Sequence, residues 1–375
     1  MTELLPDMRT VGSGGYSPGD VQFLLRPMHM AMTDVEEKER LIQTNQKHYS
    51  EMISMEHAPT DMHKALFALA LERNGRRMAA EVMAVAQALH AAFAGPGNAG
   101  GKGGAMPGIA LVSFVRAGLP LGVLLRRALR DMGREVSHYG ISIIRDRGVD
   151  TVALEAIIEA HGAENIVFVD GWTGKGAISG ELHRVLDADR RFPSGPRLAV
   201  LADPCGRAWL AASAEDWVIP SGILGATVSG LISRSIWPVE GGLHGCVVYN
   251  HLREHDVSRA FIERIEDERR SLAPVPPAAP WTDEQKKELR QAAATVVDSL
   301  AARFGIANMN RVKPGIAEAT RAVLRRVPDH VLVRDRNDSD VRLLLHLTER
   351  AGVPVEEAGS ALGPYRAVTI IRSVR

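Results

Sequence analysis

The chain has 375 residues, too long for one ordinary hydrophobic core, so two or three domains are expected. Hydrophobic residues make up 45% and charged residues 24%, and Lys plus Arg equals Asp plus Glu at 45 each, so net charge indicates no acidic partner. Its two cysteines exclude a disulfide framework and a four-cysteine zinc site. Without a signal-peptide pattern or a membrane-length apolar run, we expect a cytoplasmic protein with no membrane partner.

Residues 1–105 are expected to form a helical N-terminal segment ending in a glycine-rich linker, with residues 16–95 mostly helical. The best-marked helix spans 61–92, where Leu66, Met78, Val82 and Leu89 recur at helical spacing. The stretch GPGNAGGKGGAMPG (95–108) has no strand before it, so a flexible connection is favoured over a phosphate-binding loop.

Strands and helices alternate over residues 106–271. Apolar runs at 108–118, 136–148, 165–171 and 197–203, with a shorter one at 216–221, predict strands buried on both faces. Helices are predicted between them at 119–132, 151–161 and 175–186. This alternation predicts an α/β fold with a doubly wound parallel sheet.

A Pro/Ala-rich linker at 272–281 leads into residues 282–375. Helices are predicted there at 283–304, 315–326 and 338–351, and strands at 330–335 and 365–372. From residue 310 onward, twelve Lys or Arg stand against eight Asp or Glu, a mildly basic balance that is weak evidence for nucleic acid. The pattern predicts a small C-terminal α/β domain.

The most informative motif is NIVFVDGWTGKGAISGEL (165–182). Asp170 ends a buried strand, at the edge where open parallel sheets bind ligands. The glycines of the next turn, Thr173-Gly174-Lys175-Gly176, let backbone N–H groups converge on an anion where a helix begins. The spacing matches neither the Walker loop nor the dinucleotide fingerprint. A strand-to-helix turn whose glycines serve only packing is the alternative.

This motif resembles the ribose 5-phosphate cradle of type I phosphoribosyltransferases. The resemblance implies that Asp170 holds the ribose hydroxyls of phosphoribosyl pyrophosphate (PRPP), directly or through Mg²⁺. It implies that the sugar phosphate also contacts Ala117, Gly118, Gly171, Trp172, Thr173, Gly174, Lys175 and Gly176. The activity it implies is transfer of ribose 5-phosphate to an unknown acceptor with release of pyrophosphate.

Two further elements follow the order of that family. Arg116-Ala117-Gly118 ends the first strand, where the family keeps its pyrophosphate loop, and Arg145 and Arg147 follow the second, where its mobile catalytic loop begins. Catalytic roles are therefore implied for Asp170, Arg116, Arg145 and Arg147. Taken alone, Arg145 or Arg147 is more typical of a solvated turn charge, and it is the order of all three elements that favours the family.

The segment NRVKPGIAEATRAVLRR (310–326) resembles the Pelota-type, kink-turn-binding RNA domains. The resemblance implies that RNA is a partner, bound by Arg311, Lys313, Gly315, Glu318, Arg321 and Arg325. A helix N-terminus beside basic residues is also a phosphate-binding corner on physical grounds. A fold kept for docking or for forming a homo-oligomer is the alternative.

Longer stretches, including SGGYSPGDVQFLLRP and IPSGILGATVSGLISR, resemble a bacterial phosphoribosyltransferase-like family of tellurite-resistance and stress operons. Its members carry a C-terminal Pelota-like domain and also circulate under the label cysteine protease StiP. Two rival functions follow: a sugar-phosphate-sensing RNA-binding protein, and a cysteine peptidase using Cys205 or Cys246. For the peptidase, candidate bases are His138, His244, His251 and His255, but no nucleophile signature is present and buried cysteines are usually inert.

Overall fold

The computed structural model describes residues 15–94 and 108–373, and its largest element is a six-stranded sheet. The strand order is β1-β4-β3-β7-β8-β9, and every neighbouring pair is parallel. The strands are β1 (Gln22–Phe23), β3 (Ile109–Phe114), β4 (Val136–Ile141), β7 (Ile166–Val169), β8 (Leu198–Ala202) and β9 (Leu210–Ser213). This topology confirms the predicted parallel α/β fold. The predicted glycine-rich linker at 95–108 lies outside the described residues except for Gly108.

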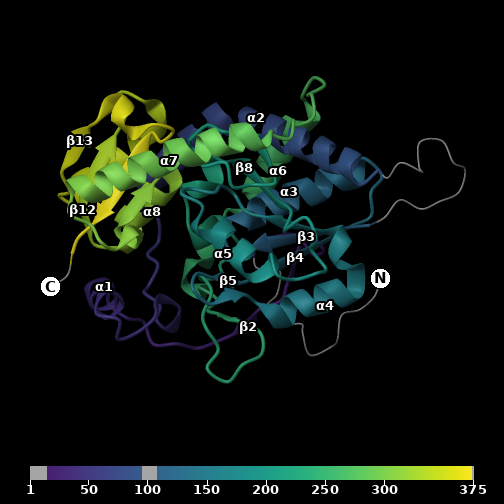
Figure 1. Ribbon diagram of the computed structural model, residues 1–375, viewed down its shortest axis with the longest axis horizontal. Coiled ribbons are helices and arrows are strands. Elements are labelled where there is room, and N and C mark those ends of the chain that lie inside the picture. Colours follow the sequence, from purple (N-terminus) through teal and green to yellow (C-terminus); the bar gives the residue numbers. More distant parts are fainter. Residues whose placement is uncertain (1–14, 95–107, 374–375) are drawn as a thin grey trace, which may run out of the picture.

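Helices cover both faces of this sheet (Figure 1). One face is covered by α2 (Asp61–Ala92), α3 (Gly118–Asp131) and α6 (Ser258–Arg270), and the other by α4 (Thr151–His161) and α5 (Ala177–Leu186). Side chains of β3 alternate between the two cores, with Leu111 on the α3 side and Val112 and Phe114 on the α4 side. Because both faces are buried, the strands are apolar throughout, which explains why continuous apolar runs located them.

Two expectations for the main domain are wrong. Residues 16–60 are not mostly helical: besides α1 (Val35–Gln43) they contribute β1 to the sheet edge and β2 (Arg26–Pro27), which pairs with β10 (Gly245–Cys246). The apolar run at 216–221, predicted as a fifth strand, is not a strand. The strand that follows β8 in the sheet is β9. Trp217 and Ile219 are each only 2% exposed, but the chain there is an irregular segment that continues into a 3-10 turn at Pro220. A buried apolar run alone does not distinguish the two.

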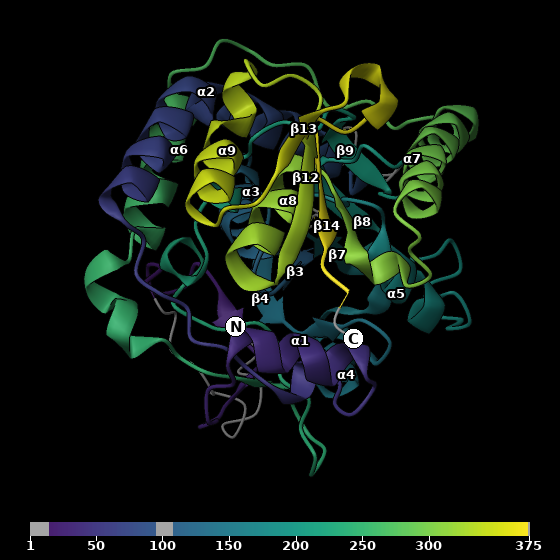
Figure 2. The same cartoon turned by 90° about the vertical axis from the view of Figure 1, so that its left-hand side faces the viewer.

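The C-terminal domain is built on a four-stranded sheet of order β11-β14-β12-β13. Its strands are β11 (Val312–Pro314), β12 (Pro328–Val333), β13 (Val355–Glu357) and β14 (Ala367–Ile371). One face packs against α8 (Ile316–Arg325) and α9 (Arg342–Arg350), and the other against α7 (Asp283–Arg303) (Figure 2). Ile316 and Ala319 of α8 belong to the same hydrophobic core as Val169 of the main sheet, so the two sheets share a core.

Candidate functional site

A cavity of about 870 Å³ opens beyond the carboxyl ends of β3, β4 and β7. Three parts of the chain line it: the N-terminal segment between residues 35 and 63, the loops that follow the sheet strands, and the C-terminal domain, mainly residues 308–326. Counted over these described lining residues, twelve are Lys or Arg and five are Asp or Glu. The cavity is therefore a cationic, concave surface suited to a polyanionic ligand.

Asp170 lies at the carboxyl end of β7, as predicted, and lines this cavity. Its side chain is 8% exposed, and its Oδ1 accepts a hydrogen bond of 2.8 Å from the backbone N–H of Gly171. Burial raises the pKa of Asp170 to about 7, against a smaller lowering by this hydrogen bond and by Arg321. A carboxyl group that titrates near neutrality is suited to binding ribose hydroxyls or exchanging a proton with them.

In the turn after Asp170, the backbone N–H of Thr173 donates to the carbonyl of Ala202 at 3.1 Å, and that of Gly176 donates to the carbonyl of Thr173 at 2.9 Å. Gly174 and Gly176 have φ angles of 57° and 85°, and Gly176 is the N-cap of α5. Two side chains of the turn are already bound, however. The Thr173 hydroxyl donates to Oδ1 of Asp203 at 2.6 Å, and the Lys175 ammonium donates to the carbonyl of Val312 at 3.1 Å. Burial and the neighbouring Arg145 lower the pKa of Lys175 to about 8.

Arg116, at the end of β3, reaches the cavity but is fully engaged. Its Nη1 donates to the carbonyl of Ile232 and its Nη2 to Oε2 of Glu56, both at 2.9 Å. Burial alone would raise the pKa of Glu56, but Arg116 and Arg325 lower it to about 2, so this carboxylate stays ionised. Glu56 belongs to the irregular N-terminal segment and carries no sequence signal that marks it.

The neighbouring Gly118 is required by packing. A Cβ added there would lie 2.2 Å from the carbonyl oxygen of Val169, so only glycine permits α3 to start beside β7. Of the residues predicted to bind PRPP, those whose side chains line the cavity are Ala117, Trp172, Thr173, Lys175 and Asp170. The four glycines, Gly118, Gly171, Gly174 and Gly176, shape the loops behind them.

At Arg145–Arg147, where the family resemblance implies the start of a mobile loop, the structure shows the turn of a hairpin. The chain turns at once into a hairpin, β5 (Ile143–Ile144) with β6 (Gly148–Val149). Arg145 lines the cavity, where its Nη1 donates to Oδ1 of Asn310 at 2.6 Å. Arg147 is not among the lining residues: it pairs with Glu51, and its guanidinium lies 4.8 Å from the ring centre of Trp237.

Five of the six residues predicted to bind RNA line this same cavity: Arg311, Lys313, Glu318, Arg321 and Arg325. The guanidinium of Arg321 lies 4.5 Å from the ring centre of Trp172, whose side chain also hydrogen-bonds Glu318. Gly315, with a φ of 92°, is the N-cap of α8. The sequence predicted two separate sites, and the structure brings them together.

Neither cysteine has the environment of a nucleophile. Cys205 is 2% exposed within the core formed by α7 and the C-terminal sheet, and its thiol contacts Oγ1 of Thr173 at 3.3 Å. Burial raises the pKa of Cys205 far above its usual range, and that of Cys246 to about 12. Nucleophilic thiolates need the opposite shift.

Residues 15–94 and 108–373 contain neither a cluster of metal-binding side chains nor a membrane-spanning helix. No three or more His, Cys, Asp or Glu side chains in that part of the chain converge as a metal-binding group. No helix there combines the length and apolar character needed to cross a bilayer. Any Mg²⁺ would therefore depend on ligand oxygens in addition to Asp170.

Comparisons with known proteins identify the family to which this chain belongs. A family model described as "Tellurite-like stress resistance cysteine protease StiP" matches residues 14–266, and the PELOTA RNA binding domain matches residues 291–373. The curated "Cysteine protease StiP" of Acinetobacter baylyi is 51% identical, over 96% of this chain and 94% of that protein. Among solved structures, hypoxanthine phosphoribosyltransferase of Trypanosoma cruzi bound to IMP is 18% identical over 38% of this chain and 68% of that chain, with a TM-score of 0.27. A second structure of that enzyme is 16% identical over 38% and 77%, also with a TM-score of 0.27. On the family match and the curated relative, the chain belongs to the tellurite-like stress resistance cysteine protease StiP family, with a PELOTA RNA binding domain at its C-terminal end.

Proposed function

We propose that the chain binds PRPP, or a closely related sugar phosphate, and transfers ribose 5-phosphate to an acceptor with release of pyrophosphate. One observation carries the proposal. Asp170 and the Thr173–Gly176 turn lie together at the carboxyl edge of a parallel sheet and border a large cavity in which cations outnumber acids by more than two to one. Ligands of such sheets bind at this edge, and the cations match a ligand with several phosphates.

The proposed reaction breaks the bond between the anomeric carbon and pyrophosphate and forms one to the acceptor. The sugar gains positive charge while negative charge grows on the departing diphosphate. Asp170 holds the ribose hydroxyls, and within the Thr173–Gly176 turn the backbone N–H groups of Gly174 and Lys175 hold the 5′-phosphate, because those of Thr173 and Gly176 donate to carbonyl groups. Arg145 faces the cavity and stabilises the leaving group. Mg²⁺ fits beside Asp170 because it typically binds one or two carboxylates plus substrate phosphates, where it would neutralise charge on the diphosphate.

The family's peptidase label directs attention to the two thiols. Buried thiols with raised pKa values hold their protons at neutral pH, which disfavours attack on a peptide carbonyl. The geometry therefore favours sugar-phosphate chemistry over peptide hydrolysis. The rival function, a sugar-phosphate sensor that reports to RNA through its C-terminal domain, would bind the same ligand without forming a product and without needing a bound metal.

The test is magnesium-dependent release of pyrophosphate from PRPP, with nucleobases and small metabolites offered as acceptors. Wild-type protein should release pyrophosphate with at least one acceptor, and Asp170→Asn should not. PRPP binding by calorimetry without turnover would favour the sensor. Absence of PRPP binding in the wild-type protein would overturn the proposal.

A further inference from the structure

We propose that the C-terminal domain supplies a second anion-binding subsite to this cavity, formed by Lys313, Arg321 and Arg325, and that it takes a diphosphate group. This inference rests on the proposed function, because the ligand's other end is assigned to Asp170 and the Thr173–Gly176 turn. It also gives a new role to residues whose pattern resembles an RNA-binding signature.

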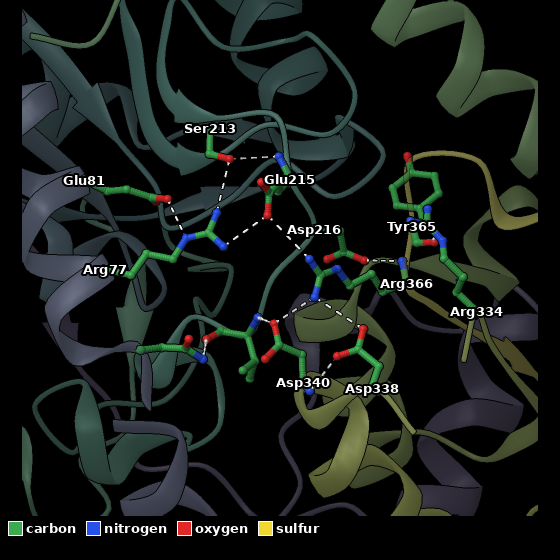
Figure 3. A network of polar contacts seen from close by, with 12 residues as sticks. Arg77, Glu81, Ser213, Glu215, Asp216, Arg334, Asp338, Asp340, Tyr365 and Arg366 are labelled. Carbon is green, nitrogen blue, oxygen red and sulfur yellow. Dashed lines mark hydrogen bonds and ion pairs between the residues drawn. The ribbon is translucent and has the colours of Figure 1, made fainter. Parts of the chain in front are cut away.

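The first support is the firm docking of the C-terminal domain beside the site. The buried Asp216 accepts hydrogen bonds from the backbone N–H of Ile316, at 3.0 Å, and of Arg366, at 2.8 Å. Figure 3 shows the side chain of Arg366 continuing this network to Asp340, at 3.2 Å, and to Glu215, at 3.4 Å. The network crosses from the main domain to the start of α8, so it fixes where that helix lies.

The second support is direct contact between α8 and the phosphate turn. A Cβ added at Gly174 would lie 3.3 Å from Cγ of Glu318, and the Tyr365 hydroxyl donates to the carbonyl of Gly174 at 3.2 Å. Arg321 covers the ring of Trp172, two residues beyond Asp170. The face of α8 that carries the signature therefore points at the sugar-phosphate site.

The third support is that two arginines in the positions of the family's pyrophosphate and catalytic loops are each paired with a glutamate of the protein. Arg116 is held by Glu56 and the Ile232 carbonyl, and Arg147 by Glu51, away from the cavity. Of the three arginines implied by the family resemblance, Arg145 is the one whose hydrogen bond inside the cavity goes to a neutral side chain, that of Asn310. A single arginine is not enough to balance the charge of a diphosphate, because protein sites usually bind this group with several cationic side chains.

The cations of the C-terminal domain meet that need. In the described part of the chain, Lys313 and Arg321 make no ion pair within 4.0 Å, and Nε of Arg321 is buried with no hydrogen-bond partner. Arg325 reaches only Glu56, at 3.5 Å, a carboxylate that it shares with Arg116. Burial is the main cause that lowers the pKa of Lys313, and the neighbouring Arg145 and Arg326 lower it further, so an anion bound beside Lys313 would favour its charged form. A bound diphosphate supplies the missing negative charge in a partly desolvated place.

The experiment divides the ligand into its two ends and uses the full chain. Lys313→Gln and Arg321→Gln are compared with Lys287→Gln and Arg342→Gln, exposed residues of α7 and α9 that do not line the cavity. Each protein is titrated by calorimetry with inorganic pyrophosphate plus Mg²⁺ and, separately, with ribose 5-phosphate, after thermal unfolding confirms its fold. We expect pyrophosphate affinity to fall about tenfold or more in the two cavity variants, with ribose 5-phosphate affinity and both controls within about twofold.

Other outcomes separate this inference from the proposed function. Unchanged pyrophosphate affinity in both cavity variants, or no pyrophosphate binding in the wild-type protein, overturns the second subsite. If Asp170→Asn abolishes PRPP binding in that case, the proposed function is supported while the second subsite is overturned. Pyrophosphate binding that depends on Lys313, with PRPP binding indifferent to Asp170→Asn, supports the subsite and overturns the function. Loss of affinity for structured RNA, with pyrophosphate binding unaffected, assigns these residues to RNA instead.

Discussion

Replacing Asp170 with asparagine should stabilise the fold while abolishing ligand binding. Burial raises the pKa of this carboxyl from its ordinary 3.8 to about 7, so the folded chain keeps a proton that the unfolded chain releases. The contribution of Asp170 to wild-type stability is therefore highest below about pH 4, falls as pH rises towards 7, and is level above it. About three pKa units at about 1.36 kcal/mol each give about 4 kcal/mol, an upper limit because water and structural relaxation reduce the cost of the buried charge. Asparagine removes this titration and keeps an acceptor oxygen for the N–H of Gly171.

The assay is thermal unfolding of both proteins at pH 5 and pH 8, with PRPP binding measured in parallel. Between these values the stability advantage of Asp170→Asn should grow by up to about 3 kcal/mol, which covers the two pH units below the folded pKa. Asp216→Asn is the comparison variant: burial raises the pKa of Asp216 only to about 6, so its own pH-dependent change between pH 5 and pH 8 should be about 1 kcal/mol. The carboxylate of Asp216 accepts hydrogen bonds from the backbone N–H groups of Ile316 and Arg366. In Asp216→Asn the side-chain NH₂ would face one of these donors, which should lower the free energy of unfolding by about 1–3 kcal/mol at pH 8. An Asp170→Asn advantage that does not grow with pH would refute the reasoning about buried charge, and unchanged PRPP affinity would remove Asp170 from the site.

Three further outcomes follow from the site. Cys205→Ala and Cys246→Ala should leave pyrophosphate release unchanged, because both thiols are buried with raised pKa values; a thiol-directed adduct that stops turnover would argue for the peptidase. Affinity for ribose 5-phosphate should fall as pH rises through about 8, where Lys175 loses its charge, and calorimetry from pH 7 to 9 should show a flatter profile for Lys175→Arg. Gly118→Ala should yield no soluble folded protein, because its methyl group would lie 2.2 Å from the Val169 carbonyl; a normal circular dichroism spectrum would contradict that close approach.

Elements defined by local signals were predictable. The helix at 61–92 has the expected bounds because Thr60 caps it by accepting from the N–H of His63, and Asp150 caps α4 in the same way through the N–H of Ala153. The parallel strands were found because they are buried on both faces. The same reasoning gave a wrong strand for the segment after Asp216. Its apolar side chains are buried as in a strand, but the chain there is irregular, and the carboxylate of Asp216 binds the C-terminal domain.

The residues of the site also fall into a group that the sequence could predict and a group that it could not. Asp170 and the glycine turn are contiguous in sequence, so their shared location at a strand end was predictable. The approach of Arg321 to Trp172 joins residues 149 positions apart and depends on how Asp216 and Arg366 dock two domains. No spacing rule contains that information. The sequence singled out these residues through the RNA-binding resemblance, but packing between the domains decides the direction in which they point.

The fixed position of the C-terminal domain also changes how water is kept from the reacting sugar. A sugar cation must be shielded while pyrophosphate leaves, and a closing loop commonly does this. Here the segment resembling such a loop is a short hairpin bound at successive residues: the N–H of Arg145 donates to the Tyr49 hydroxyl at 2.8 Å, that of Asp146 to Glu181 at 2.9 Å, and Arg147 pairs with Glu51. A hairpin bound in this way has little freedom to close. Under the proposed function, shielding therefore falls to the wall made by α8 and the N-terminal segment, and that wall also carries the cations proposed to hold the diphosphate.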